Sequence, residues 1–322
     1  MKTLSPEKRP PLVVILGPTA VGKTEIAIQL AEQFQGEIVS ADSRLFYRGM
    51  DIGTAKPSSE ERQRAPHHLI DVADPDEVWS LAHFQEQARK VILEITARKN
   101  LPFLVGGTGQ YIRAVIEGWQ APPVAPNLAL RKALEDWAQE LGQDGLHARL
   151  AALDPEAAQR IDARNVRRCI RAVEVILSTG RRFTEQRQRG ESPYDLLLLG
   201  LIRPRLELYA RIDARIEAMF EAGMVEEVQG LLARGYEPTL PALSAIGYRE
   251  IIRYLQGEID LTEARLLIQR ATRTYVRRQA NWFKADDPRI AWFQVSEGVL
   301  EQMGEKISGW LSTRQHSVRT GI

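Results

Sequence analysis

The 322-residue sequence predicts an α/β protein with a parallel sheet core, an all-helical insertion domain and a helical C-terminal region. Three observations support this class. Short apolar runs alternate with amphipathic helical patterns in the first part of the chain. Residues 128–189 then show helical periodicity and no strand pattern. A strongly apolar segment at 196–202 (LLLLGLI) has the composition of a buried parallel strand, so the chain returns to the sheet there.

The first predicted strand leads into the clearest motif of the chain. The apolar run 12–16 is followed by the octet GPTAVGKT and then by an amphipathic helix at 25–31. This spacing fits G-x-x-x-x-G-K-[ST], in which backbone N–H groups cradle phosphates at a helix N-terminus. We therefore expect a P-loop NTPase-like core that binds a di- or triphosphate through Gly17, Pro18, Thr19, Ala20, Val21, Gly22, Lys23 and Thr24.

Individual residues of this loop have distinct expected roles. Gly17 and Gly22 permit backbone conformations and close approaches that a Cβ would forbid. Lys23 supplies a positive charge to the terminal phosphates, and Thr24 supplies a hydroxyl suited to a Mg²⁺ cofactor. The alternative is an ordinary glycine-rich turn, but the complete octet stands in the strand–turn–helix context that the motif requires.

A second short strand at 37–40 runs into Asp42. Side chains at the carboxyl ends of strands in open α/β sheets face the ligand crevice, so we expect Asp42 to face the bound phosphates. Spacing supports two roles for Asp42 equally. It is either a helix cap or Mg²⁺-sphere residue, or a general base that takes a proton from an acceptor nucleophile. The following segment, 44–57, has two glycines and a closing proline and predicts an ordered loop.

The next helix and strand repeat the pattern. A helix is predicted at 80–97 and a buried strand at 102–105, which ends in a second glycine turn at 106–109. Two glycine turns after two strands are typical of a doubly wound α/β sheet. Thr108 in this turn is placed to offer its hydroxyl or its N–H to a phosphate, with a plain turn as the alternative.

Beyond residue 119 the chain changes character. Long amphipathic helices are predicted at 206–233 and 261–283. We expect a discontinuous catalytic core at 10–118 and 193–322, and a helical insertion at 119–192.

The composition excludes several classes of protein. No apolar run approaches the ~20 residues that span a bilayer, and residues 1–11 lack the apolar stretch of a signal peptide. A single cysteine, Cys169, excludes an internal disulfide framework and a multi-cysteine zinc finger. The adjacent His67 and His68 point in different directions, so structural roles are expected for them. We predict a cytoplasmic monomer that binds no membrane.

Arginine clusters break the near-neutral charge of the chain. Nine arginines and only three acids fall between residues 159 and 189, and four of these arginines have the spacing of one helix face: Arg164, Arg167, Arg168 and Arg171. The expected core-facing stripe consists of Val166, Ile170, Val173 and Leu177. A second basic face precedes Trp282 and Phe283, and consists of Arg270, Arg273, Thr274, Arg277, Arg278 and Gln279. Two basic faces with aromatic residues predict contacts with an RNA backbone and an unstacked base.

One absence weakens an ATPase interpretation. An ATPase normally has a hydrophobic strand that ends in Asp. The strand at 102–105 ends in glycines instead, and only the strand that runs on to Asp42 offers such a carboxylate.

Eight segments, in order along nearly the whole chain, carry a family resemblance: GPTAVGKT (17–24), SADSRLFYRGMDIGTAKP (40–57), PHHLIDVADPDE (66–77), VGGTGQYIRA (105–114), NVRRCIRAVEV (165–175), LYARIDARIEAMFEAGMVEEV (208–228), SAIGYRE (244–250) and TRTYVRRQANW (272–282). They closely resemble the tRNA dimethylallyltransferases. The resemblance implies transfer of a dimethylallyl group from dimethylallyl diphosphate to N6 of the adenosine just 3′ of the anticodon, in tRNAs that read codons beginning with U. Departures from the family pattern are small: position 45 is Leu and position 110 is Gln, where many members carry Gln and Leu respectively.

The resemblance also implies roles for individual residues. The phosphate loop holds the diphosphate of the donor in place of ATP, with Mg²⁺ and Lys23 neutralising its charge. Asp42 accepts the N6 proton, Thr108 contacts the departing bridging oxygen, and Arg215 clamps the diphosphate. The implied contacts with the anticodon stem-loop are Asp42, Ser43, Arg44, Leu45, Thr108, Arg131, Arg167, Arg168, Cys169, Ile170, Arg171, Ser244, Ala245, Ile246, Gly247, Tyr248, Arg249, Arg273, Arg277, Arg278 and Gln279.

Two other functions stay open at this point. An adenylate isopentenyltransferase has the same core and a mononucleotide acceptor, which needs no such basic surface. A P-loop ATPase that binds RNA without modifying it would use the same loop for ATP.

Overall fold

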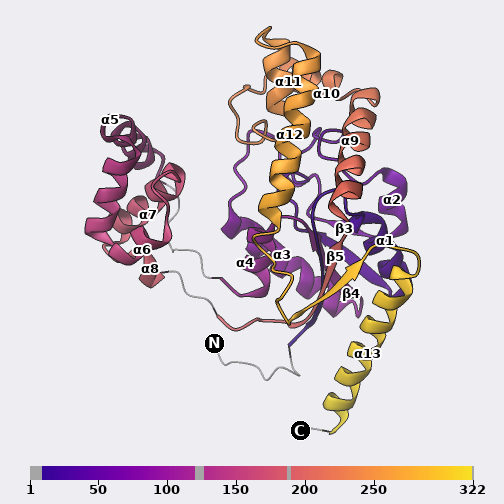
Figure 1. Cartoon of the computed structure of the whole chain (residues 1–322). Helices are drawn as coiled ribbons and strands as arrows, with labels where there is room; N and C mark the ends of the chain where they lie inside the picture. The colour runs from indigo at the N-terminus through magenta and orange to yellow at the C-terminus, as the bar shows by residue number, and fades with distance from the viewer. Residues whose placement is uncertain (1–8, 120–126, 187–189, 321–322) are drawn as a thin grey trace. The chain divides into compact units, whose positions relative to one another are not determined.

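The structure, a computed structural model, describes residues 9–119, 127–186 and 190–320 (Figure 1). The chain divides into a core unit of residues 1–116 and 192–322 and an insertion unit of residues 117–191. The expected insertion bounds, 119 and 192, lie two residues and one residue later than these.

The core unit contains a parallel six-stranded sheet with strand order β3-β2-β4-β1-β5-β6. Its strands are β1 (Pro11–Leu16), β2 (Gly36–Ser40), β3 (His67–His68), β4 (Leu101–Gly106), β5 (Asp195–Ile202) and β6 (Ile290–Gln294). The four predicted strands are confirmed. The sequence did not predict β3, which is too short to show a periodicity, or the edge strand β6. The central strand β1 is buried because it pairs with β4 on one side and β5 on the other.

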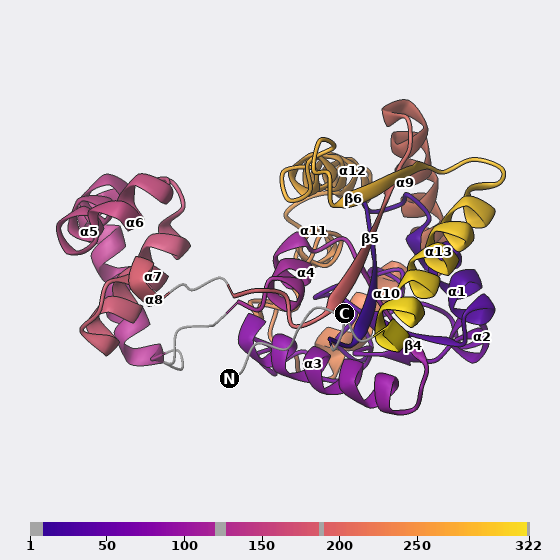
Figure 2. The same ribbon diagram turned by 90° about the horizontal axis from the view of Figure 1, so that it is seen from below.

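Helices cover the sheet and extend beyond its carboxyl edge (Figures 1 and 2). Four of them, α1, α3, α4 and α13, pack against strands, and α9 to α12 pack against one another. The bounds are α1 (Lys23–Gln33), α2 (Ser59–Arg64), α3 (Leu81–Ala97), α4 (Gly109–Ile116), α9 (Arg205–Glu221), α10 (Met224–Ala233), α11 (Tyr248–Leu255), α12 (Leu261–Gln279) and α13 (Val299–Thr320).

Two helix predictions need correction. The predicted helix at 206–233 is two helices, because Gly223 adopts a left-handed conformation (φ 95°) between α9 and α10. The predicted helix at 261–283 ends at Gln279, before Trp282 and Phe283.

The insertion unit is helical throughout its described residues, as predicted. Its helices are α5 (Leu128–Leu153), α6 (Pro155–Arg160), α7 (Val166–Thr179) and α8 (Phe183–Gln186). They enclose a separate apolar core to which Leu146, Cys169 and Val173 belong. Of the predicted core-facing stripe, Ile170 and Val173 are buried, but Leu177 is 52% exposed.

The parallel sheet explains where the predicted site residues meet. β1 leads into the phosphate loop, β2 leads into Asp42, and β4 leads into the turn that contains Thr108. Since all strands run in the same direction, their carboxyl ends lie at one edge of the sheet. Three segments that are far apart in sequence are therefore brought together at this edge.

A close approach between β5 and β6 gives a test of this core. Gly200 pairs with Trp292, and a Cβ on Gly200 would lie 2.3 Å from the Trp292 ring. Gly200→Ala should lower the free energy of unfolding by about 1–3 kcal/mol, because the ring must move to relieve overpacking. Urea denaturation measures this change. The matched control is Gly230→Ala in α10, where nothing lies within 4 Å of the new Cβ, and a gain of up to about 1 kcal/mol is expected. Equal unfolding midpoints for both variants would contradict this packing.

Candidate active site

The phosphate loop has the geometry that its sequence predicts. A Cβ on Gly17 would lie 2.8 Å from the backbone oxygen of Leu201, and Gly22 has a left-handed φ of 109°. Helix α1 begins at Lys23, and no side chain caps the N–H groups of its first turn. Uncapped N–H groups at a helix N-terminus bind anions, so the backbone at this position can donate hydrogen bonds to phosphate oxygens.

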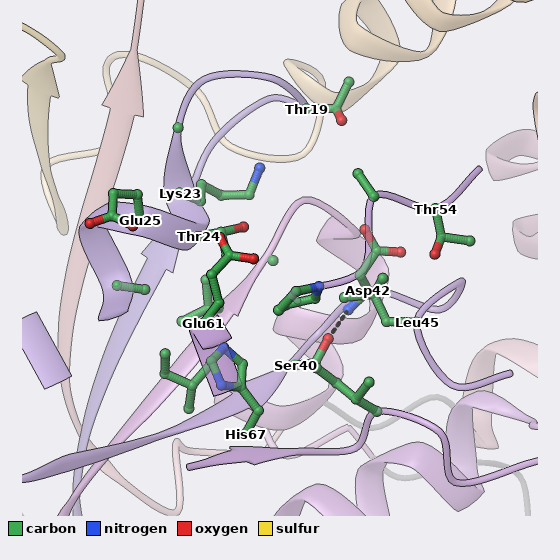
Figure 3. A pocket seen from close by; sticks show the side chains of 18 of the residues that line it. Thr19, Lys23, Thr24, Glu25, Ser40, Asp42, Leu45, Thr54, Glu61 and His67 are labelled. Atoms are coloured by element: carbon green, nitrogen blue, oxygen red, sulfur yellow. Dashed lines mark hydrogen bonds between the residues drawn. The ribbon is translucent and has the colours of Figure 1, made fainter. Parts of the chain in front are cut away.

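A cavity of about 290 Å³ lies over this loop (Figure 3). The loop residues that line it are Thr19, Ala20, Gly22, Lys23 and Thr24. Gly17 and Pro18 line a different cavity, and the Val21 side chain is fully buried. These three residues therefore present no side chain to the cavity over the loop, and any contact they make with a phosphate there must come from the backbone, as the motif implies.

Lys23 is held at the centre of the loop. Its Nζ donates hydrogen bonds to the backbone oxygens of Gly17 (3.0 Å) and Pro18 (2.8 Å). Burial lowers the pKa of Lys23 to about 8, the nearby carboxylate of Asp42 opposes this shift, and Arg215 adds to it. The charged form of Lys23 is thus poorly compensated in the free protein, and an anion would stabilise it.

Arg215, on α9, supplies a second cation to the same cavity. Burial lowers its pKa, Asp42 opposes the shift, and Arg211 adds to it. Within the described part of the chain, neither Arg215 nor Lys23 forms an ion pair. The cavity therefore holds positive charge that calls for an anionic ligand.

The geometry of Asp42 is compatible with both roles that the sequence left open. Its Oδ1 accepts a hydrogen bond from the backbone N–H of Arg44 (3.0 Å), and its own N–H donates to Ser40 Oγ (3.3 Å; Figure 3). Oδ1 therefore stabilises the turn after β2, as a capping carboxylate does. Oδ2 has no hydrogen-bond partner among the described residues and is available to a substrate.

A second, larger cavity of about 950 Å³ adjoins the first. The two share five lining residues, which are Thr19, Ala20, Asp42, Thr54 and Arg215. Further arginines line only the second cavity, namely Arg44, Arg249, Arg253, Arg270 and Arg278. Asp42 thus lies where the first cavity, which is about the size of a phosphate group, meets the larger and basic second cavity.

Thr108 also lines the second cavity. Its Oγ1 is buried and has no partner at hydrogen-bonding distance in the described residues. The hydroxyl of Tyr275 lies close to Thr108. Burial raises the pKa of Tyr275 and the charge of Asp42 raises it further, while the polar side chains of Thr108 and Gln279 partly offset the rise. The Thr108 hydroxyl thus lies beside the Tyr275 hydroxyl in the lining of the second cavity, where a substrate atom can reach it.

The predicted RNA contacts of the core unit divide into two groups. Nine of them line the second cavity: Asp42, Ser43, Arg44, Thr108, Ser244, Ala245, Ile246, Arg249 and Arg278. The others do not. Leu45 lines the first cavity, and Arg277 lines a third cavity behind the loop. Arg273 pairs with Asp213 and stacks on Tyr209, which ties α12 to α9.

Three predicted RNA contacts are structural. Tyr248 is fully buried, and its hydroxyl donates to Glu227 (2.6 Å). Gly247 is also buried, and a Cβ there would lie 2.2 Å from Met224. The side-chain amide of Gln279 is bonded through its oxygen to the Thr19 N–H and through its nitrogen to the Gly107 oxygen. The side chains of these residues are therefore unavailable to RNA, contrary to prediction.

In the insertion unit the four-arginine face does not form as predicted. Helix α7 begins at Val166, so Arg164 precedes it and pairs with Asp162 (2.6 Å). Arg171, together with Arg131, pairs with the buried Glu174 (2.8 Å each).

Two arginines of that face stay exposed. Arg167 and Arg168 form no ion pair within the described ranges. Cys169 and Ile170 are buried in the insertion core, so their predicted contact with RNA through side chains is wrong. Arg167 and Arg168 remain the best candidates on α7 for phosphate contacts.

No group of three or more His, Cys, Asp or Glu side chains in the described residues suits a metal ion. Both histidines have a hydrogen-bonded ring nitrogen: His67 Nδ1 bonds the oxygen of Ala65 (2.8 Å), and His68 Nε2 bonds Glu37 (2.6 Å). His67 also lines the first cavity. Thr24 lines the first cavity. Its hydroxyl fits a Mg²⁺ that phosphate oxygens and water otherwise surround, which is a common arrangement for this ion.

Three further residues of the site went unpredicted. Glu61 and Arg211 line the first cavity, and Tyr275 lines the second. Arg211 stands four residues before Arg215 on α9, so helical spacing could have identified it. Glu61 lies on the short helix α2, which is too short to show a helical periodicity in the sequence and was therefore not predicted.

Lys23 makes the affinity for a diphosphate depend on pH. A bound diphosphate stabilises the charged lysine, so binding near pH 8 takes up a proton. Affinity for an organic diphosphate should be nearly constant around pH 7 and should fall above pH 8, approaching about tenfold per pH unit. Isothermal titration calorimetry between about pH 7 and 9.5 measures it. Lys23→Met should bind weakly with little pH dependence, and an unchanged affinity of the native protein across this range would contradict the assignment.

Comparison with known proteins identifies the family of the chain. A family model described as IPP transferase matches residues 45–286, and one described as isopentenyl transferase matches residues 10–73. The chain is similar to the tRNA dimethylallyltransferase of Roseiflexus sp. (55% identity; 92% of this chain, 97% of the relative). It is also similar to that of Thermomicrobium roseum (50% identity; 93% and 91%).

Solved structures show the same fold. The full-length tRNA isopentenylpyrophosphate transferase of Bacillus halodurans superposes with a TM-score of 0.73 at 40% identity, covering 97% of this chain and all of that one. A eukaryotic dimethylallyltransferase acting on tRNA gives a TM-score of 0.77 at 25% identity, covering 96% of this chain and 79% of that one. None of the helices in the described residues is long and apolar enough to cross a membrane. By sequence and fold, this chain belongs to the IPP transferase family.

Proposed function

We propose that the protein transfers a dimethylallyl group from dimethylallyl diphosphate to N6 of the adenosine immediately 3′ of the anticodon in tRNA. The observation that carries this proposal is the position of Asp42, which lines both the phosphate-sized cavity and the larger basic cavity. The names of the relatives support tRNA prenylation. We further propose that the substrates are tRNAs that read codons beginning with U, and that the enzyme acts as a cytoplasmic monomer.

The first cavity suits the leaving group. Transfer breaks the bond between the allylic C1 and the bridging oxygen, which leaves its electron pair on diphosphate. Lys23, Arg215 and the uncapped N–H groups of α1 are placed to stabilise that charge. Thr24 would hold Mg²⁺, which neutralises further charge on the diphosphate when bound. We infer that Thr108 Oγ1, which lines the adjoining second cavity, donates to the departing oxygen.

The second cavity suits the acceptor. A base in a stacked anticodon loop is out of reach, so the adenosine must be extruded into the protein, as other base-modifying enzymes require. Among the described residues, Arg270 and Arg278 line this cavity and have no ion-pair partner, so they are free to contact phosphates. Holding N6 against the allylic carbon supplies the proximity that the reaction needs.

Asp42 links the two halves of the reaction. N6 forms a bond to C1 as the bond from C1 to oxygen breaks, and one N6 proton then passes to Asp42. The Arg44 N–H holds Oδ1 in place, which leaves Oδ2 to accept that proton.

The alternatives are distinguished by simple measurements. An adenylate isopentenyltransferase would prenylate AMP in preference to tRNA. An RNA-binding ATPase would turn over ATP, and ATP rather than dimethylallyl diphosphate would protect it thermally. The direct test of the proposal is mass spectrometry of nucleosides from tRNA incubated with the protein and dimethylallyl diphosphate. N6-(dimethylallyl)adenosine next to the anticodon is expected, and its absence with an active donor would reject the proposal.

Asp42→Ala should separate chemistry from binding. Loss of the base should slow single-turnover transfer by about 10²–10⁴-fold, while the dissociation constant for tRNA, measured by filter binding, changes little. Ser40→Ala is the control, because it removes only the hydroxyl that accepts from the Asp42 N–H. Equal losses of transfer and of tRNA binding in Asp42→Ala would show that this residue positions tRNA instead.

The pair Arg167→Ala and Arg168→Ala tests the insertion. If both side chains contact phosphates, the slope of log K for tRNA against log salt should become shallower by about 1.5. Arg164→Ala is the matched control, because that arginine is already paired with Asp162 and should leave the slope nearly unchanged. An unchanged slope in the double variant would remove both residues from the interface.

A further inference from the structure

We propose that Gln279 is a positioning residue that holds the phosphate loop and the Thr108 turn in their reactive arrangement. This inference rests on the proposed function, since it concerns the same site. It replaces the RNA contact that the sequence suggested for Gln279. The residue is the last of α12 and is only 9% exposed.

The side chain of Gln279 joins three segments of the chain. Its Oε1 accepts a hydrogen bond from the backbone N–H of Thr19 in the phosphate loop (2.9 Å). Its Nε2 donates to the backbone oxygen of Gly107 in the turn after β4 (2.9 Å). One amide therefore ties the end of α12 to both loops that carry the reaction.

Only an amide of this length meets both requirements. A carboxamide offers an acceptor and a donor side by side. A glutamate at position 279 would keep the bond from Thr19 but would place an oxygen against the Gly107 oxygen. A methionine would fill the space and lose both bonds.

The turn is shaped to the same side chain. A Cβ on Gly107 would lie 2.3 Å from Gln279 Nε2 and 3.3 Å from the Gly17 oxygen. Gly107 and Gln279 thus occupy adjoining space at the back of the site. A methyl group at position 107 must displace the amide, which would release the Thr19 N–H as well.

Both tied loops lead directly to reacting groups. Thr19 lines both cavities, and Thr108 follows Gly107 and lines the acceptor cavity. α12 itself carries Tyr275 and Arg278 into the acceptor cavity. Gln279 therefore fixes the phosphate loop, Thr108 and the α12 side of the acceptor cavity relative to one another. A misplacement of about 1 Å in such a site costs about 10²-fold in rate.

The test compares Gln279→Met and Gln279→Glu with Gln269→Met. Gln269 lies on the same helix and lines neither cavity of the site, and its side chain makes no hydrogen bond among the described residues. We expect kcat/KM for dimethylallyl diphosphate to fall about 10- to 100-fold in both Gln279 variants, with weaker binding of inorganic diphosphate by calorimetry in Gln279→Met. Both variants should keep the tRNA dissociation constant within about threefold. Gln269→Met should match the native enzyme.

A double-mutant cycle with Gly107→Ala sharpens the test. Gly107→Ala alone should impair transfer like the Gln279 variants. Combined with Gln279→Ala, which vacates the space that the new methyl group needs, it should cost little more than either change alone. Additive losses would break the proposed link between the two residues.

Other outcomes separate this inference from the proposed function. No transfer by the native protein would reject the proposed function itself. Native transfer with unchanged donor kinetics in both Gln279 variants would reject the positioning role. Loss of tRNA affinity with intact diphosphate binding would make Gln279 an RNA contact instead. A lower melting temperature with native kcat and KM would leave it a purely structural residue and overturn the inference.

Discussion

Two buried cations, Lys23 and Arg215, which form no ion pair among the residues that the structure describes, set the constraint on which this site depends. Loss of solvent lowers the pKa of both, and the only carboxylate that acts against the shift in both cases is that of Asp42. The fold creates this situation by ending β1, β2 and β4 at one edge of a parallel sheet and laying α9 across it. A diphosphate would compensate this charge, and in the proposed reaction it is also the leaving group that the protein must stabilise.

The same edge of the sheet divides the site into two spaces. Asp42 stands between them because the turn after β2 fixes one of its carboxylate oxygens and leaves the other open. Diphosphate chemistry and proton removal can thus proceed on opposite sides of one residue. Hydrogen bonds between distant segments hold the surroundings of the site in place. The Glu227 carboxylate, for example, accepts hydrogen bonds from the backbone N–H groups of residues 51–53 and from the Tyr248 hydroxyl on α11.

Local signals were enough to predict the sheet strands near the site, the loop at 17–24, and the positions of Asp42 and Thr108. These depend on apolar runs followed by glycine turns, and such patterns are local. The arginine faces were predicted less well, because spacing does not reveal partners. Glu174 takes up Arg131 and Arg171, and α7 begins after Arg164. Gln279 was misjudged for the same reason: its partners lie 260 and 172 residues away in the chain.

The central claim is that donor and acceptor meet at Asp42 from two sides. A crystal structure with a non-reactive thio-analogue of dimethylallyl diphosphate and an anticodon stem-loop tests it most directly. We expect diphosphate oxygens on the loop at 17–24, beside Lys23 and Arg215. We also expect an extruded adenine in the second cavity, with its N6 within hydrogen-bonding distance of Asp42. A diphosphate bound away from this loop, or an adenine that enters without approaching Asp42, would contradict it.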